Sequence, residues 1–242
     1  MCLANVGSGA PAGRPVPFLY PFSHTPPMET GHHESCQRRV RVVHDGLVAV
    51  DTTEAIYVWE HPYYPWWYVP TASVKSELLP DAALSDGIGI DGYTRIDWKG
   101  VDAWFEEDEE AFGHPRDPYH RVDVRDSSRH VRVSIDGVVV AESNHPRLLF
   151  ETGLPARYYL PKLDVRTDLL TPTAKSSVCP YKGVAEYWSV DVNGTTHPDV
   201  VWSYRDPIPE AFKIAGLVSF YNEKVDIEVD GHPVGRPVTA FS

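Results

Sequence analysis

Cysteine is scarce in this chain of 242 residues: there are three, Cys2, Cys36 and Cys179, and no two of them form a Cys-x-x-Cys pair. An odd, sparse set excludes a disulfide framework, and the missing pair spacing gives no sign of a structural zinc site. The eleven histidines show no recognised ligand spacing either. We therefore expect a cytoplasmic protein with no metal site and no evident cofactor.

The chain also lacks long apolar runs and an excess of basic residues. No apolar run approaches the roughly 20 residues that a membrane-spanning helix needs, so we expect no membrane partner. Lys and Arg number 22 against 34 Asp and Glu, which gives a formal net charge of −12. Because clustered Lys and Arg are needed to neutralise nucleic-acid phosphates, this balance argues against a nucleic-acid partner.

The first residues show no structural pattern. Residues 1–37 are rich in Pro and Gly and lack the charged, apolar and cleavage regions of a secretory signal. Patterned sequence begins only near Arg38, so Met28 is a second candidate for the translation start. We predict that these residues form an N-terminal tail.

Two stretches of the chain repeat one another. Residues 40–79 align without gaps on residues 131–170, and 12 of the 40 pairs are identical, where chance would give roughly two or three. The repeat predicts a tandem of two related modules. The predicted division is an N-terminal tail at 1–37, a diverged first module at 38–128 and a second module at 129–242.

A shorter match extends the repeat. The sequence "WKGVDAWF" at 98–105 resembles "YKGVAEYW" at 181–188, so that Lys99 aligns with Lys182 and Ile96 stands in the place of Cys179. We expect the shared Lys-Gly to make the same turn and the same lysine contact in both modules. Since the cysteine belongs to the second module alone, a single active or binding site is expected there.

Both modules carry the pattern of antiparallel β-sheets. Apolar and polar residues alternate with period two, and Asp-Gly or Asn-Gly pairs separate the strand-like runs at 45–46, 136–137, 193–194 and 230–231. Such pairs favour two-residue hairpin turns. Helical pattern is limited to short pieces, so the fold class is predicted to be mainly β.

The sequence "CPYKG" at 179–183 is the main candidate for chemistry. A thiol is a nucleophile only as the thiolate, and a nearby ammonium stabilises that anion. Cys179 and Lys182 would meet this condition if the turn folded them onto one side. The alternative is that Cys179 is a small buried residue at the start of a strand. The sequence does not decide whether the protein is an enzyme.

Aromatic and charged residues of the second module predict a binding pocket. Several aromatic faces with one lysine and one arginine suit a flat or anionic small molecule, although such rings also pack β-sheet cores. Glu151, and Glu60 at the matching repeat position, are expected to form solvated ion pairs with an arginine such as Arg157. The predicted ligand-binding residues are Arg157, Tyr159, Tyr181, Lys182, Trp188, Trp202, Tyr204 and Asp206.

These motifs carry a family resemblance. The stretches "FETGLPARYYLP", "CPYKGVAEYWSV" and "IAGLVSFYNEKVDIEVDG" resemble the family called domain of unknown function 427. The resemblance is close over the second module and looser over the first. With its two copies, the chain is similar to proteins found in actinobacteria. It implies two tandem β-tent-like modules of antiparallel sheets with short helices. The zinc that other β-tent families hold through cysteine pairs does not transfer to this chain.

Three functions remain open from the sequence. Our first hypothesis is that the second module binds a small molecule in a pocket lined by aromatic residues, lysine and arginine. The alternatives are a small-molecule enzyme that uses Cys179 or Lys182, and a protein-interaction module that docks through its aromatic surface. The ligand, any reaction and the oligomeric state cannot be read from the residues.

Overall fold

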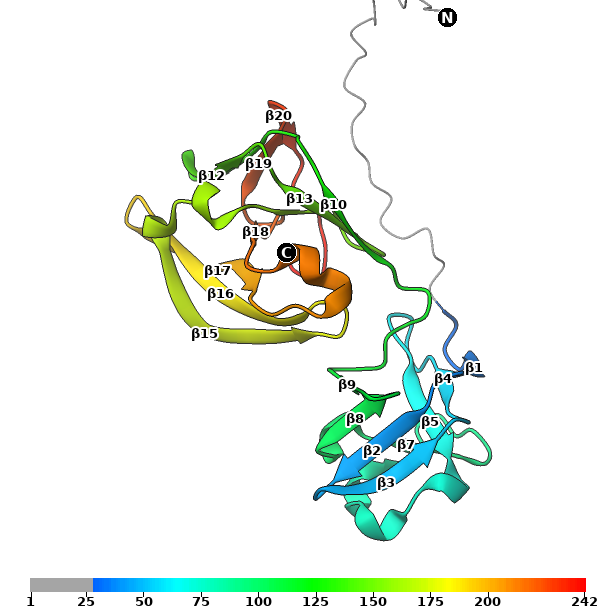
Figure 1. Ribbon diagram of the computed structural model, residues 1–242. Coiled ribbons are helices and arrows are strands. Elements are labelled where there is room, and N and C mark those ends of the chain that lie inside the picture. The colour runs from blue at the N-terminus through cyan, green and yellow to red at the C-terminus, as the bar shows by residue number, and fades with distance from the viewer. Residues whose placement is uncertain (1–27) are drawn as a thin grey trace, which may run out of the picture.

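The computed structural model describes residues 28–242 and confirms the mainly β fold (Figure 1). The paired strands are antiparallel throughout these residues, and their helical segments are 3-10 turns of three to six residues. None of the helices in this part of the chain is long and apolar enough to cross a membrane. Most of the predicted N-terminal tail, residues 1–27, lies outside the described residues.

The first module consists of two antiparallel sheets. One contains, in spatial order, β1 (His33–Ser35), β4 (Ile56–Val58), β5 (Trp66–Pro70), β7 (Tyr93–Ile96) and β6 (Leu84–Ser85). The other contains β3 (Leu47–Thr52), β2 (Val40–His44), β8 (Ala103–Glu106) and β9 (Glu109–Ala111). The short turns of this module are η1 (Thr71–Ser73), η2 (Ser76–Leu78), η3 (Asp81–Ala83) and η4 (Trp98–Gly100).

The second module contains three sheets. The first contains β10 (Val122–Asp126), β13 (Arg147–Glu151) and β14 (Arg157–Tyr159). The second contains, in spatial order, β12 (Val138–Ser143), β11 (Val131–Ile135), β19 (Asp226–Val229) and β20 (His232–Val234). The third contains β15 (Leu170–Cys179), β16 (Gly183–Val192), β17 (Thr195–Tyr204) and β18 (Val218–Phe220). The short turns are η5 (Lys162–Asp164), η6 (Thr167–Leu169) and η7 (Pro209–Ile214). In Figure 1, β15, β16 and β17 form one long curved sheet.

The predicted tandem repeat is visible strand by strand. Strands β2 and β3 correspond to β11 and β12, each pair 91 residues apart along the chain. The β-bulge between Val42 and Val43 recurs at Val133, and the bridge between Val50 and Val74 recurs at the matching residues of the second module. Because bulges and bridges depend on register, this agreement shows that the two modules share one framework.

Each module starts with a strand that precedes its predicted boundary. Strand β1 lies within the predicted tail and pairs with β4, and β10 lies within the predicted first module and pairs with β13. The two strands occupy equivalent places, since β4 and β13 are themselves equivalent in the repeat. Neither strand was visible in the sequence, because "HES" and "VDVRD" are short and largely polar.

The expected equivalence of "WKGVDAWF" and "YKGVAEYW" is wrong. Trp98–Gly100 leads into β8, which pairs with β2, whereas residues 181–183 form the turn between β15 and β16. By strand pairing β8 corresponds to β19, so the counterpart of Trp98–Gly100 is the turn at residues 222–224. Both turns close with the same backbone bond, Gly100 N to Asp97 O and Lys224 N to Tyr221 O. The long β15–β17 strands therefore distinguish the second module.

The Asp-Gly and Asn-Gly pairs form the predicted hairpin turns. Asp136 and Gly137 have φ values of 48° and 77°, and the other three pairs are equally left-handed. Two successive positive φ values define the type I′ turn, which joins twisted strands with two residues. Gly183 differs from these turn glycines, because its φ is 100° and an added Cβ would lie 3.4 Å from the Asp206 carbonyl oxygen.

Gly183→Ala should therefore lower the free energy of unfolding by about 2–3 kcal/mol. The loss is the sum of two costs: the strain of a positive φ on alanine, and the crowding of its Cβ against the backbone of residues 206–208. Gly137→Ala is the matched control: its φ is also positive, but a Cβ there meets no atom within 4 Å. We expect a loss of about 1 kcal/mol for this control. Urea unfolding of both variants measures the difference, and equal losses would show that the close approach at Gly183 is unimportant.

Candidate functional site

A cluster of buried aromatic side chains fills the space between the β13–β14 hairpin and the β15–β18 sheet. It brings together three of the predicted ligand-binding residues, Tyr159, Trp202 and Tyr204. The Trp202 indole Nε1 donates a hydrogen bond to the Tyr159 hydroxyl oxygen at 3.0 Å. Burial raises the pKa of both tyrosines well above the ordinary value, so they remain neutral phenols. Cys179 packs against the edge of this cluster.

Beside the cluster lies a buried ion pair between Lys182 and Glu151. The Lys182 ammonium donates to Glu151 Oε2, and the two side chains are 10% and 6% exposed. His120 Nε2 lies 3.1 Å from the other carboxylate oxygen of Glu151. Burial by itself raises the pKa of Glu151, but the hydrogen bond from His120 and the charge of Lys182 outweigh it and lower that pKa to about 2. Three titratable groups thus meet in one place.

The "CPYKG" turn explains how Lys182 reaches the interior. Cys179 and Gly183 face each other as the last residue pair of the β15–β16 hairpin, and Lys182 N donates to Cys179 O at 3.2 Å. On the other side, Ile208 N donates to the Lys182 carbonyl. The residue before η7 therefore holds this turn in place. The stretch is a structural turn that directs one lysine inward.

The segment that joins the two modules covers this ion pair. His120, from this segment, stacks on the Tyr181 ring with centroids 4.1 Å apart, and the backbone N–H of Asp117 donates to the Tyr181 hydroxyl oxygen at 2.7 Å. Asp117 in turn accepts a hydrogen bond from the indole of Trp59, a core residue of the first module. A chain of contacts therefore runs from the first module to the Lys182–Glu151 pair.

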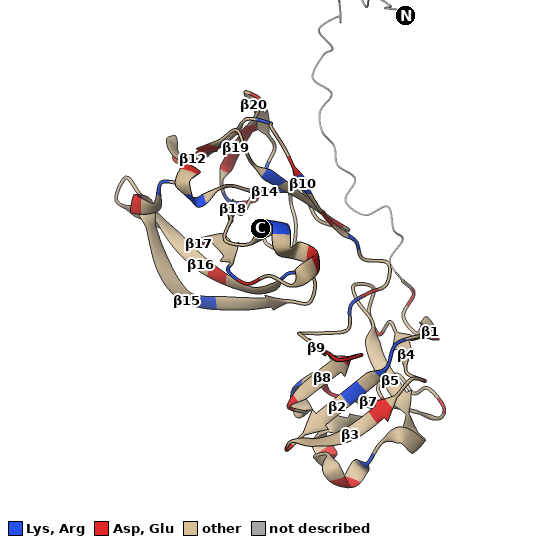
Figure 2. Cartoon of the chain, viewed as in Figure 1, with Lys and Arg blue, Asp and Glu red and all other residues tan. Residues whose placement is uncertain are grey.

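A cleft of about 520 Å³ opens beside the turn, between the two modules. Pro180 and His114 form part of its wall, and His114 also contacts the Tyr181 ring edge-on. Burial lowers the pKa of His114, which favours the neutral imidazole. The cleft wall is acidic from Glu106 at the end of β8 to Glu110 in β9, and Figure 2 colours the acidic residues of the chain red. Its charged lining residues are Arg38, Glu106, Glu107, Asp108, Glu109, Glu110, Arg116 and Glu210.

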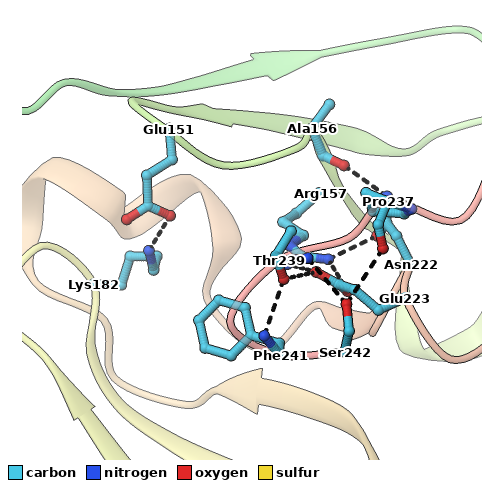
Figure 3. A network of polar contacts seen from close by, with 10 residues as sticks. All are labelled: Glu151, Ala156, Arg157, Lys182, Asn222, Glu223, Pro237, Thr239, Phe241 and Ser242. Atoms are coloured by element: carbon cyan, nitrogen blue, oxygen red, sulfur yellow. Dashed lines mark hydrogen bonds and ion pairs between the residues drawn. The ribbon is translucent and has the colours of Figure 1, made fainter. Parts of the chain in front are cut away.

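Arg157 lies at the opposite side of the aromatic cluster and has a different partner from the one expected. It donates two hydrogen bonds of 2.7 Å to the Glu223 carboxylate and one of 3.2 Å to Asn222 (Figure 3). The expected surface pair between Glu151 and Arg157 is therefore wrong: both residues are buried in separate ion pairs. In the first module, Glu60 pairs with Arg95 of β7.

Two predicted ligand-binding residues lie apart from the others. Trp188 packs against the core on the other face of β16, where the Lys162 ammonium lies 5.7 Å from its ring centroid. Its neighbour Tyr187 faces the aromatic cluster instead, because successive strand residues point to opposite faces. Asp206 is exposed. Of the remaining predicted residues, Lys182, Tyr159, Tyr181 and Tyr204 lie near Glu151. Arg157 pairs with Glu223, and Trp202 lies between the two groups, hydrogen-bonded to Tyr159 and 5.7 Å from the Arg157 guanidinium carbon.

The geometry gives limited support to nucleophilic chemistry. A lysine nucleophile must lose its proton, whereas the Lys182 ammonium donates to a carboxylate. The same pairing engages the charge that was expected to stabilise a Cys179 thiolate. Within residues 28–242, no group of three or more His, Cys, Asp or Glu side chains is placed to hold a metal ion.

Sequence reasoning missed several residues of this region. His120 and Asp117 lie in an irregular segment, and Glu223 and Asn222 occupy a turn without a recognised motif. Glu151 was expected only to form a solvated surface ion pair. The glutamate at the matching repeat position, Glu60, was the one sign in the sequence that this carboxylate has a role in both modules. A carboxylate kept at the same repeat position in both modules is what an ion pair in each of them requires.

The chain belongs to the family described as a domain of unknown function (DUF427), whose family model matches residues 32–107 and 123–231. The two matched segments begin 91 residues apart, the same spacing that relates β2 to β11. They include β1 and all of β10 except its first residue, Val122, and the second contains the whole "CPYKG" turn. A search of curated proteins found no match.

Lys182→Ala should lower the free energy of unfolding by about 3–5 kcal/mol, because it leaves the Glu151 carboxylate buried without its counterion. Lys182→Met combined with Glu151→Gln should recover most of that loss, since neither charge remains. Lys99→Ala, an exposed lysine of the first module, is the control and should change stability by less than about 0.5 kcal/mol. Urea unfolding tests all three, and a harmless Lys182→Ala would contradict the buried pair.

The lowered pKa of Glu151 also predicts a pH dependence. Because its pKa is about 2 in the folded protein and 4.5 ordinarily, the carboxylate stabilises the fold above pH 4.5. This contribution, about 3 kcal/mol, is lost as the pH falls from 4.5 towards 2. The Lys182→Met, Glu151→Gln variant lacks the titrating group. Its free energy of unfolding should therefore fall less than that of the wild type over this range, and parallel curves would refute the assignment.

Proposed function

We propose that the protein binds a small molecule in the cleft beside the "CPYKG" turn. The observation that carries the proposal is the buried cluster of Lys182, Glu151 and His120. The Tyr181 ring separates this cluster from the cleft, because it contacts His120 of the cluster on one side and His114 of the cleft wall on the other. Buried, clustered ionisable groups next to a cleft, here including a carboxyl with a lowered pKa, Glu151, are typical of binding and active sites. The cleft volume of about 520 Å³ suits a molecule of metabolite size.

The charges of the site favour a ligand that carries an amino group. Lys182 and Arg157 are each neutralised by a carboxylate, so neither is free to attract an anion. Along the cleft, Glu106 pairs with Arg38 and Glu210 with Arg116, which leaves the carboxylates of β9 in excess. An amine would be drawn to this wall, and its planar part would face the Phe112 and His114 rings, which line the cleft.

Native mass spectrometry of freshly purified protein tests the proposal. We expect a native mass above the denatured mass, and tandem mass spectrometry of the released compound should identify an amine. The variant that combines Lys182→Met with Glu151→Gln should lose the extra mass, because it replaces the ion pair that supports the Tyr181 ring next to the cleft wall. Lys99→Met should retain it.

Equal native and denatured masses of the wild type would count against the proposal. Extra mass that survives in the Lys182→Met, Glu151→Gln variant would place the ligand elsewhere. A released carboxylic acid or phosphate without an amine would overturn the charge argument, even if the cleft were the site.

A further inference from the structure

Residues 236–242 fold back across the second module and cover its other buried ion pair. Thr239 Oγ1 donates to Glu223 Oε1 at 2.6 Å, and the Phe241 ring centroid lies 5.8 Å from the Arg157 guanidinium carbon (Figure 3). The same ring lies 5.8 Å, centroid to centroid, from the ring of Tyr221. A hydroxyl and an aromatic ring are thus the two anchors of this segment.

The segment is held by side chains alone. In the described chain, each backbone hydrogen bond of residues 236–242 ends within the segment itself, as Ser242 N to Thr239 O at 3.3 Å does. Its remaining link is an exposed ion pair between Arg236 and Asp226, and such pairs contribute little to stability. The segment can therefore lift away without breaking any strand pairing, which places it among the least stable parts of the fold.

The surface beneath the segment is held by hydrogen bonds that do not involve the segment. The Arg157 and Glu223 side chains are 5% and 0% exposed, and Asn222 braces them by donating from Nδ2 to the Ala156 carbonyl oxygen at 3.0 Å. Trp202 and Tyr221 flank the guanidinium, with ring centroids 5.7 and 5.9 Å from its carbon. A carboxylate fixed by a two-point arginine contact is a preorganised acceptor for one further donor.

The spacing of the two anchors is also fixed. Phe241 N donates to Thr239 Oγ1 at 3.0 Å, so the threonine hydroxyl turns the chain and accepts from the residue two positions later. This local turn brings the ring over Arg157 while the hydroxyl reaches Glu223. Any segment with the same turn can present the same two groups.

We propose that Arg157, Glu223, Tyr221 and Trp202 form a peptide-binding site that residues 236–242 fill in the isolated chain. Its partner is a protein segment with serine or threonine followed two residues later by an aromatic residue. The hydroxyl donates to Glu223, and the ring covers Arg157 and Tyr221. This site is separate from the small-molecule cleft and does not depend on it.

The test uses a fluorescent peptide of the covering sequence, acetyl-Arg-Pro-Val-Thr-Ala-Phe-Ser-amide, and full-length protein. The combination of Thr239→Val and Phe241→Ala weakens the chain's own segment and opens the site. By fluorescence anisotropy, this variant should bind the peptide about tenfold more tightly than the wild type, since it has less internal competition. Val238→Ala, at a residue that is 86% exposed, is the control and should bind as the wild type does.

The peptide itself provides the second comparison. Valine in place of its threonine, or alanine in place of its phenylalanine, should weaken binding to the opened variant by about tenfold. Urea unfolding of the opened variant verifies that the module is folded. Absence of binding to the folded variant, equal binding to both proteins, or equal binding of the altered peptides would each overturn the proposal.

Discussion

The second module is organised around the buried pair of Lys182 and Glu151. Two charges removed from water are stable only when their geometry is held closely, because the attraction between them must offset the loss of hydration. The carboxylate stands at the end of β13, the ammonium in the turn between β15 and β16, and His120 in the segment that joins the modules. Three parts of the chain must therefore keep their places for one interaction to persist.

The repeat shows which part of this arrangement is general. Both modules keep a glutamate at the equivalent position, but Glu60 meets Arg95 of β7 and the Tyr68 hydroxyl, whereas Glu151 meets a lysine from a hairpin. That hairpin belongs to the long strands that the first module lacks. An ion-paired carboxylate at this position is common to both modules, half-buried in the first and buried in the second, and the element that supplies its counterion differs between them. The acidic cleft likewise combines β9 of one module with Pro180 of the other, so it requires the tandem.

Local patterns in the sequence were sufficient for the framework. Period-two alternation, Asp-Gly turns and the 91-residue repeat depend on neighbouring residues, and each was confirmed by strands, turns and matching bulges. The site depends on pairs that are distant along the chain: Glu151 and Lys182 are 31 residues apart, and Arg157 and Glu223 are 66 apart. Only sheet register brings such residues together. The failed match of "WKGVDAWF" has the same cause, since similarity over eight residues carries no information about which strand is the partner.

Both buried ion pairs are closed by chain from outside the sheets that hold them. Asp117 and His120 cover the Glu151 end, and residues 236–242 cover the Glu223 end. The two covers differ in how they are fastened. The first is tied to the core of the other module through Trp59, so disturbing it would strain the joint between modules. The second cover, residues 236–242, forms no backbone–backbone hydrogen bond with the rest of the second module within the described residues. Exchange of a covering segment is therefore far easier at the Glu223 end, while the Glu151 end is better suited to hold a ligand against a fixed wall.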